Sequence, residues 1–197
     1  MNLEDQIQRV RDTVTIEQLN DELAPLLQLA LDHEVKSVLE IGSRFGGTLK
    51  CWLHILNVKY AMCIDLPLEN DAKVTQERDA LWRSWLRYNQ TLNTIFGRSE
   101  SKSTLDRVYY QLTKPIDMVF IDGGHSYEQV KADYKNYAHL AKKIVAIHDI
   151  TPSTVLSESE YGVPKFWNEV RPTHGLKIEL KGKTGPNGGY GIGVIVL

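Results

Sequence analysis

The chain has 197 residues, enough for one globular domain that buries about two-thirds or more of its unfolded surface without disulfides or structural metals. Its 23 Lys and Arg residues against 25 Asp and Glu residues give a formal net charge of −2, so it lacks the basic excess of nucleic-acid and membrane-surface binders. No stretch reaches the about 18 apolar residues of a membrane span, and no signal-peptide pattern begins the chain; we expect a cytoplasmic protein with no membrane partner.

The N-terminal region has a helical pattern. Residues 1–14 are charged and amphipathic, and residues 15–33 place apolar residues at helical spacing, with Thr15 as the expected N-cap. No repeat, low-complexity linker or shift in composition marks a second domain. We therefore expect a single domain over all 197 residues, in which residues 1–35 form a helical cap on a core of residues 36–197.

Beyond this cap, short apolar runs alternate with helical patterns. The predicted strands span residues 36–42, 59–66, 93–97, 116–122 and 143–149. The predicted helices between them span residues 46–56, 71–92, 101–113 and 126–142. Such alternation is typical of a parallel sheet covered by helices on both faces, so we expect an α/β fold.

The C-terminal part departs from this alternation. A short helix is predicted over residues 163–170, followed by apolar runs at 175–180 and 190–197. The segment 181–189 between these runs is rich in glycine, which favours an antiparallel hairpin.

The predicted helix 71–92 combines tryptophans with arginines, which has two interpretations. One is a stacking surface for nucleic-acid bases. The other, which we favour, is a packing face with the arginines in solvent. In this second interpretation the buried residues are Leu81, Trp82, Trp85 and Leu86, and the solvent-exposed ones are Arg78, Arg83 and Arg87.

The turn after the first predicted strand is rich in glycine. Residues 40–47 read Glu-Ile-Gly-Ser-Arg-Phe-Gly-Gly, and in open α/β sheets ligands bind beyond the carboxyl ends of the strands. Thr48 stands where a P-loop requires lysine, and Ser43-Arg44 interrupts the GxGxxG pattern of dinucleotide-binding folds. Further on, Asp65 ends the second strand, where a carboxylate can accept hydrogen bonds from both hydroxyls of a ribose. Ordinary turn glycines and a solvated aspartate remain the alternative.

Ionisable residues follow the fourth and fifth predicted strands. Asp122 and Asp149 end these strands, and adjacent parallel strands would bring the two carboxylates close enough to share a divalent cation. His125 follows two glycines that let the chain curl, so its imidazole can face the same pocket and remove the proton of an attacking hydroxyl. His148 either shifts the metal preference toward manganese, iron or zinc, or is a core side chain that binds no metal. Two alternatives remain: His125 as a helix cap, and Asp122 as an acceptor for turn amides.

The glycine-rich turn resembles that of the class I S-adenosylmethionine (SAM)-dependent methyltransferases. The stretch "VLEIGSRFGGT" looks like their motif I, and "CIDLP" looks like the acidic motif after their second strand. The resemblance implies that Gly42, Gly46 and Gly47 line the methionine part of the cofactor, that Glu40 shapes this pocket and that Asp65 holds the ribose.

The loop after the third strand is similar to the adenine-side loop of these enzymes. Its sequence is "FGRSE", and because Arg98 replaces the usual aspartate, only Ser99 is carried over. The cofactor-binding residues implied by the resemblance are Glu40, Gly42, Ser43, Gly46, Gly47, Asp65, Ser99 and Asp122.

Two further stretches, "FIDGGHSYEQVKADYKNY" and "VAIHDI", resemble a subgroup related to cephalosporin hydroxylase-like and macrolide sugar O-methyltransferases. This resemblance implies a Rossmann-like, seven-stranded, mostly parallel sheet with a reversed last strand. Together with the chemistry of the residues after the strands, it leads us to expect methyl transfer from SAM to a hydroxyl of a small molecule, with His125 as the catalytic base. The expected site for Mg²⁺ or Mn²⁺ consists of Asp122, His148 and Asp149.

Other functions remain open at the level of sequence. A nucleic-acid or protein methyltransferase is disfavoured because no Asn-Pro-Pro-Tyr type segment follows the fourth strand. A SAM-binding protein without catalysis is a further alternative. The sequence names neither the hydroxylated acceptor nor the oligomeric state, a homo-oligomer included.

Overall fold

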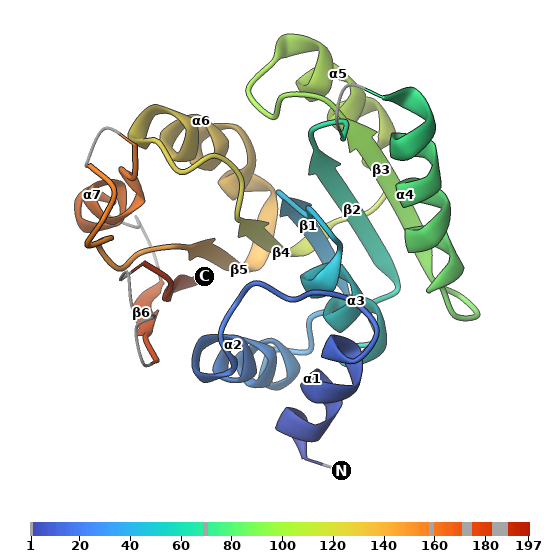
Figure 1. The fold of residues 1–197 in the computed structure, drawn as a ribbon, viewed down its shortest axis with the longest axis horizontal. Helices are drawn as coiled ribbons and strands as arrows, with labels where there is room; N and C mark the ends of the chain where they lie inside the picture. The colour runs from blue at the N-terminus through green and yellow to red at the C-terminus, as the bar shows by residue number, and fades with distance from the viewer. Residues whose placement is uncertain (1, 69–70, 158–159, 171–174, 183–188) are drawn as a thin grey trace.

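The computed structural model describes residues 2–68, 71–157, 160–170, 175–182 and 189–197. Within them, seven strands form one sheet in the order β3-β2-β1-β4-β5-β7-β6 (Figure 1). The strands are β1 (Ser37–Ile41), β2 (Tyr60–Asp65), β3 (Thr91–Phe96), β4 (Ile116–Ile121), β5 (Ala141–His148), β6 (Leu176–Leu180) and β7 (Ile192–Val196). The first five run parallel, while β7 is antiparallel to both β5 and β6. The expected α/β fold with a reversed C-terminal strand is confirmed.

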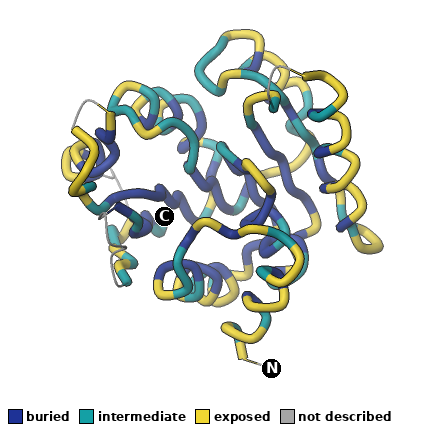
Figure 2. Tube along the Cα trace, in the orientation of Figure 1, coloured by how far each residue is buried: buried dark blue, intermediate teal, exposed yellow. Residues whose placement is uncertain are grey.

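Helices cover both faces of the sheet. Successive residues of each strand point to opposite faces, and in β1 every residue is buried, so both faces present side chains that must be covered. Val38 belongs to a buried cluster with residues of α1, α2 and α3 and with Trp82 and Trp85, whereas Leu39 belongs to a second cluster with residues of α5, α6 and α7. In Figure 2 the strands and the inner sides of the helices form the buried interior. The helices are α1 (Leu3–Arg11), α2 (Asn20–Asp32), α3 (Gly47–His54), α4 (Ala72–Ser84), α5 (Lys102–Gln111), α6 (Tyr127–Tyr137) and α7 (Val163–Glu169), with a 3₁₀ turn at Ala138–Leu140.

The strand order reverses between β1 and β4, which are neighbours in the sheet. From β1 the chain winds through β2 to β3 on one side, and it then returns to build β4 and β5 on the other. The chain after β1 leads to α3 on one face of the sheet, and the chain after β4 leads to α6 on the other face. This arrangement leaves a crevice at the carboxyl ends of the two strands, where ligands of open α/β sheets bind.

The predicted N-cap Thr15 is wrong, because α2 begins at Asn20. Arg11 donates hydrogen bonds to the carbonyl oxygens of Ile16 and Gln18, which holds the segment before α2 out of the helix. The helix is capped instead by Glu22, whose carboxylate accepts the backbone N–H of residue 19 at 2.8 Å.

Two predicted helices are too long at their C-terminal ends. α4 ends at Ser84, and Asn89, at a positive φ of 65°, belongs to the turn that leads into β3. α6 ends at Tyr137, and residues 141–143 belong to β5. The hairpin connection predicted over 181–189 lies largely outside the described residues. None of the described helices has the length and apolar character needed to cross a lipid bilayer.

The α4 tryptophans pack inward, as the favoured interpretation predicts. Trp82 and Trp85 are buried. The prediction is wrong for Leu81, which is half exposed, and for Arg78, which is buried. Arg78 lies one helical turn before Trp82 and so shares its buried face.

Candidate functional site

A cavity of about 710 Å³ lies at the carboxyl ends of the parallel strands. Its walls come from the turns after β1 to β5 and from the segment that precedes α2. It brings together most of the residues that the sequence singled out. Those that line it are Gly42, Ser43, Gly47, Asp65, Ser99, Asp122, His125, His148 and Asp149.

The turn after β1 depends on glycine at two close approaches. Gly42 has a φ of +84°, and a Cβ there would lie 1.9 Å from the carbonyl oxygen of Asp122. Gly46 has a φ of +83°, and its α-carbon faces the indole of Trp82. Gly42 thus lets the β1 and β4 turns touch. Gly46 does not line the cavity as the resemblance implied; it packs against α4.

Glu40 lies beneath this turn rather than in the cavity wall. Its carboxyl group is fully buried and accepts hydrogen bonds from Ser43 Oγ at 2.6 Å, from Thr48 Oγ1 and from Trp52 Nε1 at 3.0 Å. Burial raises the pKa of Glu40 to about 7, against the opposing effect of these hydrogen bonds. Glu40 shapes the site by holding the turn from below.

Asp65 is held by three donors at the rim of the cavity. Its oxygens accept the backbone N–H groups of Arg44 at 2.5 Å and Leu66 at 2.6 Å, and Arg78 Nη1 lies 3.2 Å away. The Arg78 guanidinium also stacks over the rings of Trp82 and Phe96. Arg78 fixes Asp65, a role that sequence reasoning missed although the helical spacing from Trp82 could have indicated it.

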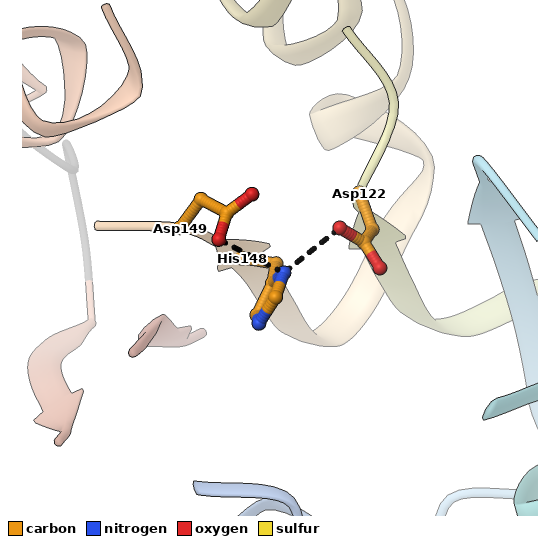
Figure 3. A group of neighbouring side chains, drawn as sticks. All are labelled: Asp122, His148 and Asp149. Carbon is orange, nitrogen blue, oxygen red and sulfur yellow. Dashed lines mark hydrogen bonds and ion pairs between the residues drawn. The ribbon is translucent and has the colours of Figure 1, made fainter. Parts of the chain in front are cut away.

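Asp122, His148 and Asp149 converge at the other end of the cavity (Figure 3). His148 Nδ1 lies 2.9 Å from Asp122 Oδ1 and 3.4 Å from Asp149 Oδ1. One ligand atom from each residue lies within 4.8 Å of the other two. Asp122 accepts no turn amide from the described residues, so the alternative given for it is not supported.

The second ring nitrogen of His148 meets another carboxylate. Nε2 lies 3.0 Å from Glu22 Oε1. Burial alone would lower the pKa of His148, but Asp122, Glu22 and Asp149 together raise it well above its ordinary value. Burial also raises the pKa of Asp122, while His148 opposes that shift. Without a metal ion, His148 is therefore held as an imidazolium, which donates from Nδ1 to Asp122 and from Nε2 to Glu22.

The donor set also fits a divalent cation. Two carboxylate oxygens and one imidazole nitrogen face one another, a combination that suits manganese and other transition metals. If a cation replaced the proton on Nδ1, the remaining Nε2–H would still donate to Glu22. Such an outer carboxylate is the usual support of a metal-binding histidine.

The N-terminal segment completes this end of the site. Gln18 Nε2 donates to Asp122 Oδ2 at 2.6 Å, and Glu22 accepts the backbone N–H of Gly191. Sequence reasoning missed both residues, because they lie 104 and 126 positions from their partners at 122 and 148, and no local pattern connects such distant positions.

His125 is half exposed at the cavity wall and pairs with Asp149. Its Nε2 lies 3.1 Å from Asp149 Oδ2, and its ring makes an edge contact with Tyr161. Since a carboxylate only accepts, Nε2 is the donor of this pair, and Nδ1 has no hydrogen bond to the described residues. The helix-cap alternative is wrong, because Ser126 caps α6 by accepting the N–H of residue 129.

Asp149 reaches both partners from an unusual backbone conformation. Its φ is +65°, which is uncommon for a residue with a side chain and occurs often at functional sites. The backbone N–H of Tyr190 donates to Asp149 Oδ1 at 3.2 Å. Asp149 Oδ1 thus faces His148, and Asp149 Oδ2 faces His125.

Comparisons with known proteins agree on the kind of domain. A family model described as a methyltransferase domain matches residues 39–150. No curated protein sequence matches significantly.

Solved structures match over almost the whole chain. A proposed caffeoyl-CoA O-methyltransferase from Staphylococcus aureus is 19% identical, with 97% of this chain and 91% of that chain covered and a TM-score of 0.65. An O-methyltransferase from Bacillus cereus in complex with S-adenosylhomocysteine (SAH) is 15% identical, with 100% and 90% covered and a TM-score of 0.64. The O-methyltransferase TomG from Streptomyces achromogenes, involved in tomaymycin synthesis and solved with SAM, is 16% identical, with 100% and 90% covered and a TM-score of 0.63. At these identities the likeness shows the fold.

Proposed function

Because the chain belongs to the methyltransferase domain family, we propose that it transfers the methyl group of SAM to a hydroxyl of a small molecule, with assistance from a divalent cation. Family membership confirms the enzyme class that the motifs indicated. The acceptor, the metal and the roles of individual residues constitute the proposal. Solved structures of similar fold in complex with SAH and SAM support it.

One observation carries the proposal: a single cavity joins Asp65 and the β1 turn to the His125–Asp149 pair. Its volume of about 710 Å³ falls within the about 300 to 1,000 Å³ typical of small-molecule sites. A methyl donor at one end and a hydroxyl-bearing acceptor at the other would therefore meet without leaving the cavity.

Asp65 has one hydrogen-bond acceptor position left for a ribose hydroxyl. A carboxylate has about four lone-pair positions, and protein donors use three of those of Asp65. We assign it one ribose hydroxyl rather than both. Gly42, Gly47 and Ser99 line the cavity. We assign the two glycines to the methionine part of SAM and Ser99 to its adenine.

His125 is the proposed base. As the acceptor oxygen bonds to the methyl carbon, the bond from that carbon to sulfur breaks and SAH leaves. The hydroxyl proton moves to Nδ1 of His125, while Asp149 holds the opposite nitrogen. A positioned base of this kind contributes about 10²- to 10⁴-fold.

Asp122, His148 and Asp149 are the proposed cation ligands. A divalent cation supplies positive charge that orients the acceptor and lowers the pKa of its hydroxyl. Glu22 and Gln18 hold His148 and Asp122 in place from the N-terminal segment.

The test is methyl transfer from SAM carrying a labelled methyl group to a library of hydroxylated compounds, with RNA, DNA and protein as parallel acceptors. Labelled small-molecule ethers support the proposal. Labelled nucleic acid or protein instead would establish another acceptor class. Cofactor binding without any product would leave a protein that binds SAM but does not catalyse.

A further inference from the structure

The segment after β5 starts at the proposed base pair and returns to it. It follows Asp149 directly in the chain, and the backbone N–H of Gly162 donates to the carbonyl oxygen of His125 at 2.8 Å. The ring of Tyr161, next to that glycine, makes an edge contact with the imidazole of His125. An acceptor hydroxyl must lie within hydrogen-bond reach of His125 to lose its proton there. The described part of the segment 150–162 therefore borders the space for the acceptor, which we call the acceptor end of the cavity.

Two apolar side chains of this segment are exposed in the cavity. Val155 is 65% exposed and Leu156 is 45% exposed, and both line the cavity. Their backbone N–H groups donate to Ser153 Oγ at 3.2 and 3.1 Å, which holds the two residues in a turn. Apolar surface of this kind gains free energy when a ligand with apolar surface of its own covers it.

Two tyrosine rings add aromatic surface at the acceptor end. The ring centroid of Tyr161 lies 5.5 Å from that of His125, and the ring centroid of Tyr190 lies 6.2 Å from that of His148. Both tyrosines line the cavity. Each offers a ring face or edge and a single hydroxyl, and neither brings a charge.

The basic side chains of the cavity lie elsewhere or are paired. Apart from histidines, the described residues that line the cavity include two, Arg44 and Arg98. Arg98 follows β3, which β2, β1 and β4 separate from β5, and Arg44 pairs with Glu17 at 2.5 Å. Lys165 lines a neighbouring cavity of about 390 Å³ and not this one. Within the described part of the chain, the acceptor end thus offers no lysine or arginine to an anionic ligand.

The cluster of Asp122, His148 and Asp149 supplies no net positive charge either. If a divalent cation is bound, the two carboxylates balance its charge. Without a cation, the imidazolium of His148 faces Asp122, Asp149 and Glu22. A carboxylate or phosphate on the acceptor would therefore lose its hydration and find no cation in exchange.

We propose that the methyl acceptor is an uncharged, largely apolar hydroxyl compound, such as a phenol, whose apolar part lies against Val155, Leu156 and the rings of Tyr161 and Tyr190. The inference rests on the proposed function, because it names the class of acceptor for that reaction. A sugar is disfavoured, since its many hydroxyls need hydrogen-bond partners that valine and leucine side chains lack. A phosphate ester or an acyl-CoA thioester is disfavoured by its negative charge.

The experiment compares three compounds that each carry a hydroxyl. They are 2-naphthol, 6-hydroxy-2-naphthoate, which adds a carboxylate to the same ring system, and methyl glucoside, which is uncharged but polar. Methyl transfer from labelled SAM in the presence of Mn²⁺, and calorimetric binding to the full chain saturated with SAH, are measured for each. We expect 2-naphthol to bind and to be methylated at least about 10-fold more efficiently than the other two, because polar and charged groups against apolar surface lose hydrogen bonds to water.

Variants of the segment test which side chains make this selection. Val155→Ser and Leu156→Ser should each weaken 2-naphthol binding by about 3- to 30-fold and leave SAH affinity within about twofold, because they remove apolar surface at the acceptor end alone. Val155→Lys should weaken 2-naphthol binding and improve binding of 6-hydroxy-2-naphthoate by about two- to fivefold, the size expected for an exposed ion pair. Leu176→Ser is the matched control, because Leu176 is 63% exposed on β6 and does not line the cavity; it should change neither ligand.

The outcomes separate the two proposals. No binding of SAH to the wild type would remove the proposed function itself. With SAH bound, equal or better methylation of 6-hydroxy-2-naphthoate or methyl glucoside would overturn the acceptor class and leave the proposed function standing. A chain that binds SAH but neither binds nor methylates 2-naphthol, or whose Val155→Ser and Leu156→Ser variants bind 2-naphthol as the wild type does, would overturn it equally.

Discussion

Asp149 Oδ2 lies 3.1 Å from His125 Nε2, while the other oxygen of the same carboxylate faces His148 Nδ1 at 3.4 Å. One side chain therefore connects the proposed base with the proposed cation site. We therefore expect a change at Asp149 to affect both groups.

His125→Ala should lower turnover by about 10²- to 10⁴-fold and leave SAM affinity within about twofold, because His125 acts on the acceptor proton and not on the cofactor. Steady-state rates and calorimetry measure the two quantities. His139→Ala is the matched control, since His139 is exposed and contacts Tyr109 away from the cavity. Unchanged turnover at saturating acceptor would remove His125 from catalysis.

Asp149→Asn and Asp122→Asn should both reduce cation affinity and acceptor use, by about 10- to 100-fold, because both carboxylates belong to the cluster. Asp149→Asn should be the more damaging, since only Asp149 also holds His125. Cation titrations and acceptor kinetics are the measurements. Equal effects of the two variants would contradict the coupling assigned to Asp149.

Excess chelator should abolish most methyl transfer and leave SAH binding intact, because Asp65 and the β1 turn hold the cofactor elsewhere. Added Mg²⁺ or Mn²⁺ should restore activity, with Mn²⁺ the better of the two if His148 is a ligand. Full activity in chelator, together with active Asn variants at 122 and 149, would show that these carboxylates only position His125 or the acceptor.

Asp65→Ala should weaken SAH binding by about 10- to 100-fold, through loss of a hydrogen bond to a charged acceptor. Arg78→Met should also weaken it, because Asp65 loses its buried partner. Glu77→Ala, one position away on the exposed side of α4, should have no effect. Calorimetry on the three variants makes the comparison, and wild-type affinity in Asp65→Ala would exclude the ribose role.

Glu40→Gln tests the pH dependence of stability. The pKa of Glu40 is raised from 4.5 to about 7 on folding, so its contribution to stability is complete below pH 4.5 and is lost as pH rises to about 7. Between pH 5 and pH 8 the wild type should lose about 2 to 3 kcal/mol relative to Glu40→Gln. Urea unfolding of both proteins at both pH values measures this. An identical change in the two proteins would mean that Glu40 does not titrate in this range.

The meeting of Asp122, His148 and Asp149 could be predicted from sequence because it depends on the sheet alone. β4 and β5 are adjacent and parallel, and Ile121 pairs with Ile147, so the residues that follow these two lie side by side. The apolar runs that identify the strands also fix where each strand ends. Polar residues at those ends must then share one rim.

Contacts made by side chains across the fold could not be predicted in the same way. Glu22 reaches the cluster from the first turn of α2, and Gln18 reaches it from the segment before α2. That segment looked helical in sequence, because the hydrogen bonds of Arg11 that redirect it depend on tertiary structure. Gly46 resembled a cofactor-lining glycine, yet its α-carbon packs against Trp82. A glycine in a motif marks a close approach, but the sequence does not say which group approaches.

The central claim is that the cavity binds SAM, and calorimetric titration of the wild-type chain tests it most directly. SAM or SAH should bind in the micromolar range, at about −7 to −8 kcal/mol, with NAD and ATP giving no heat of binding under the same conditions. No binding of SAM and SAH, with clear binding of NAD or ATP, would contradict the account.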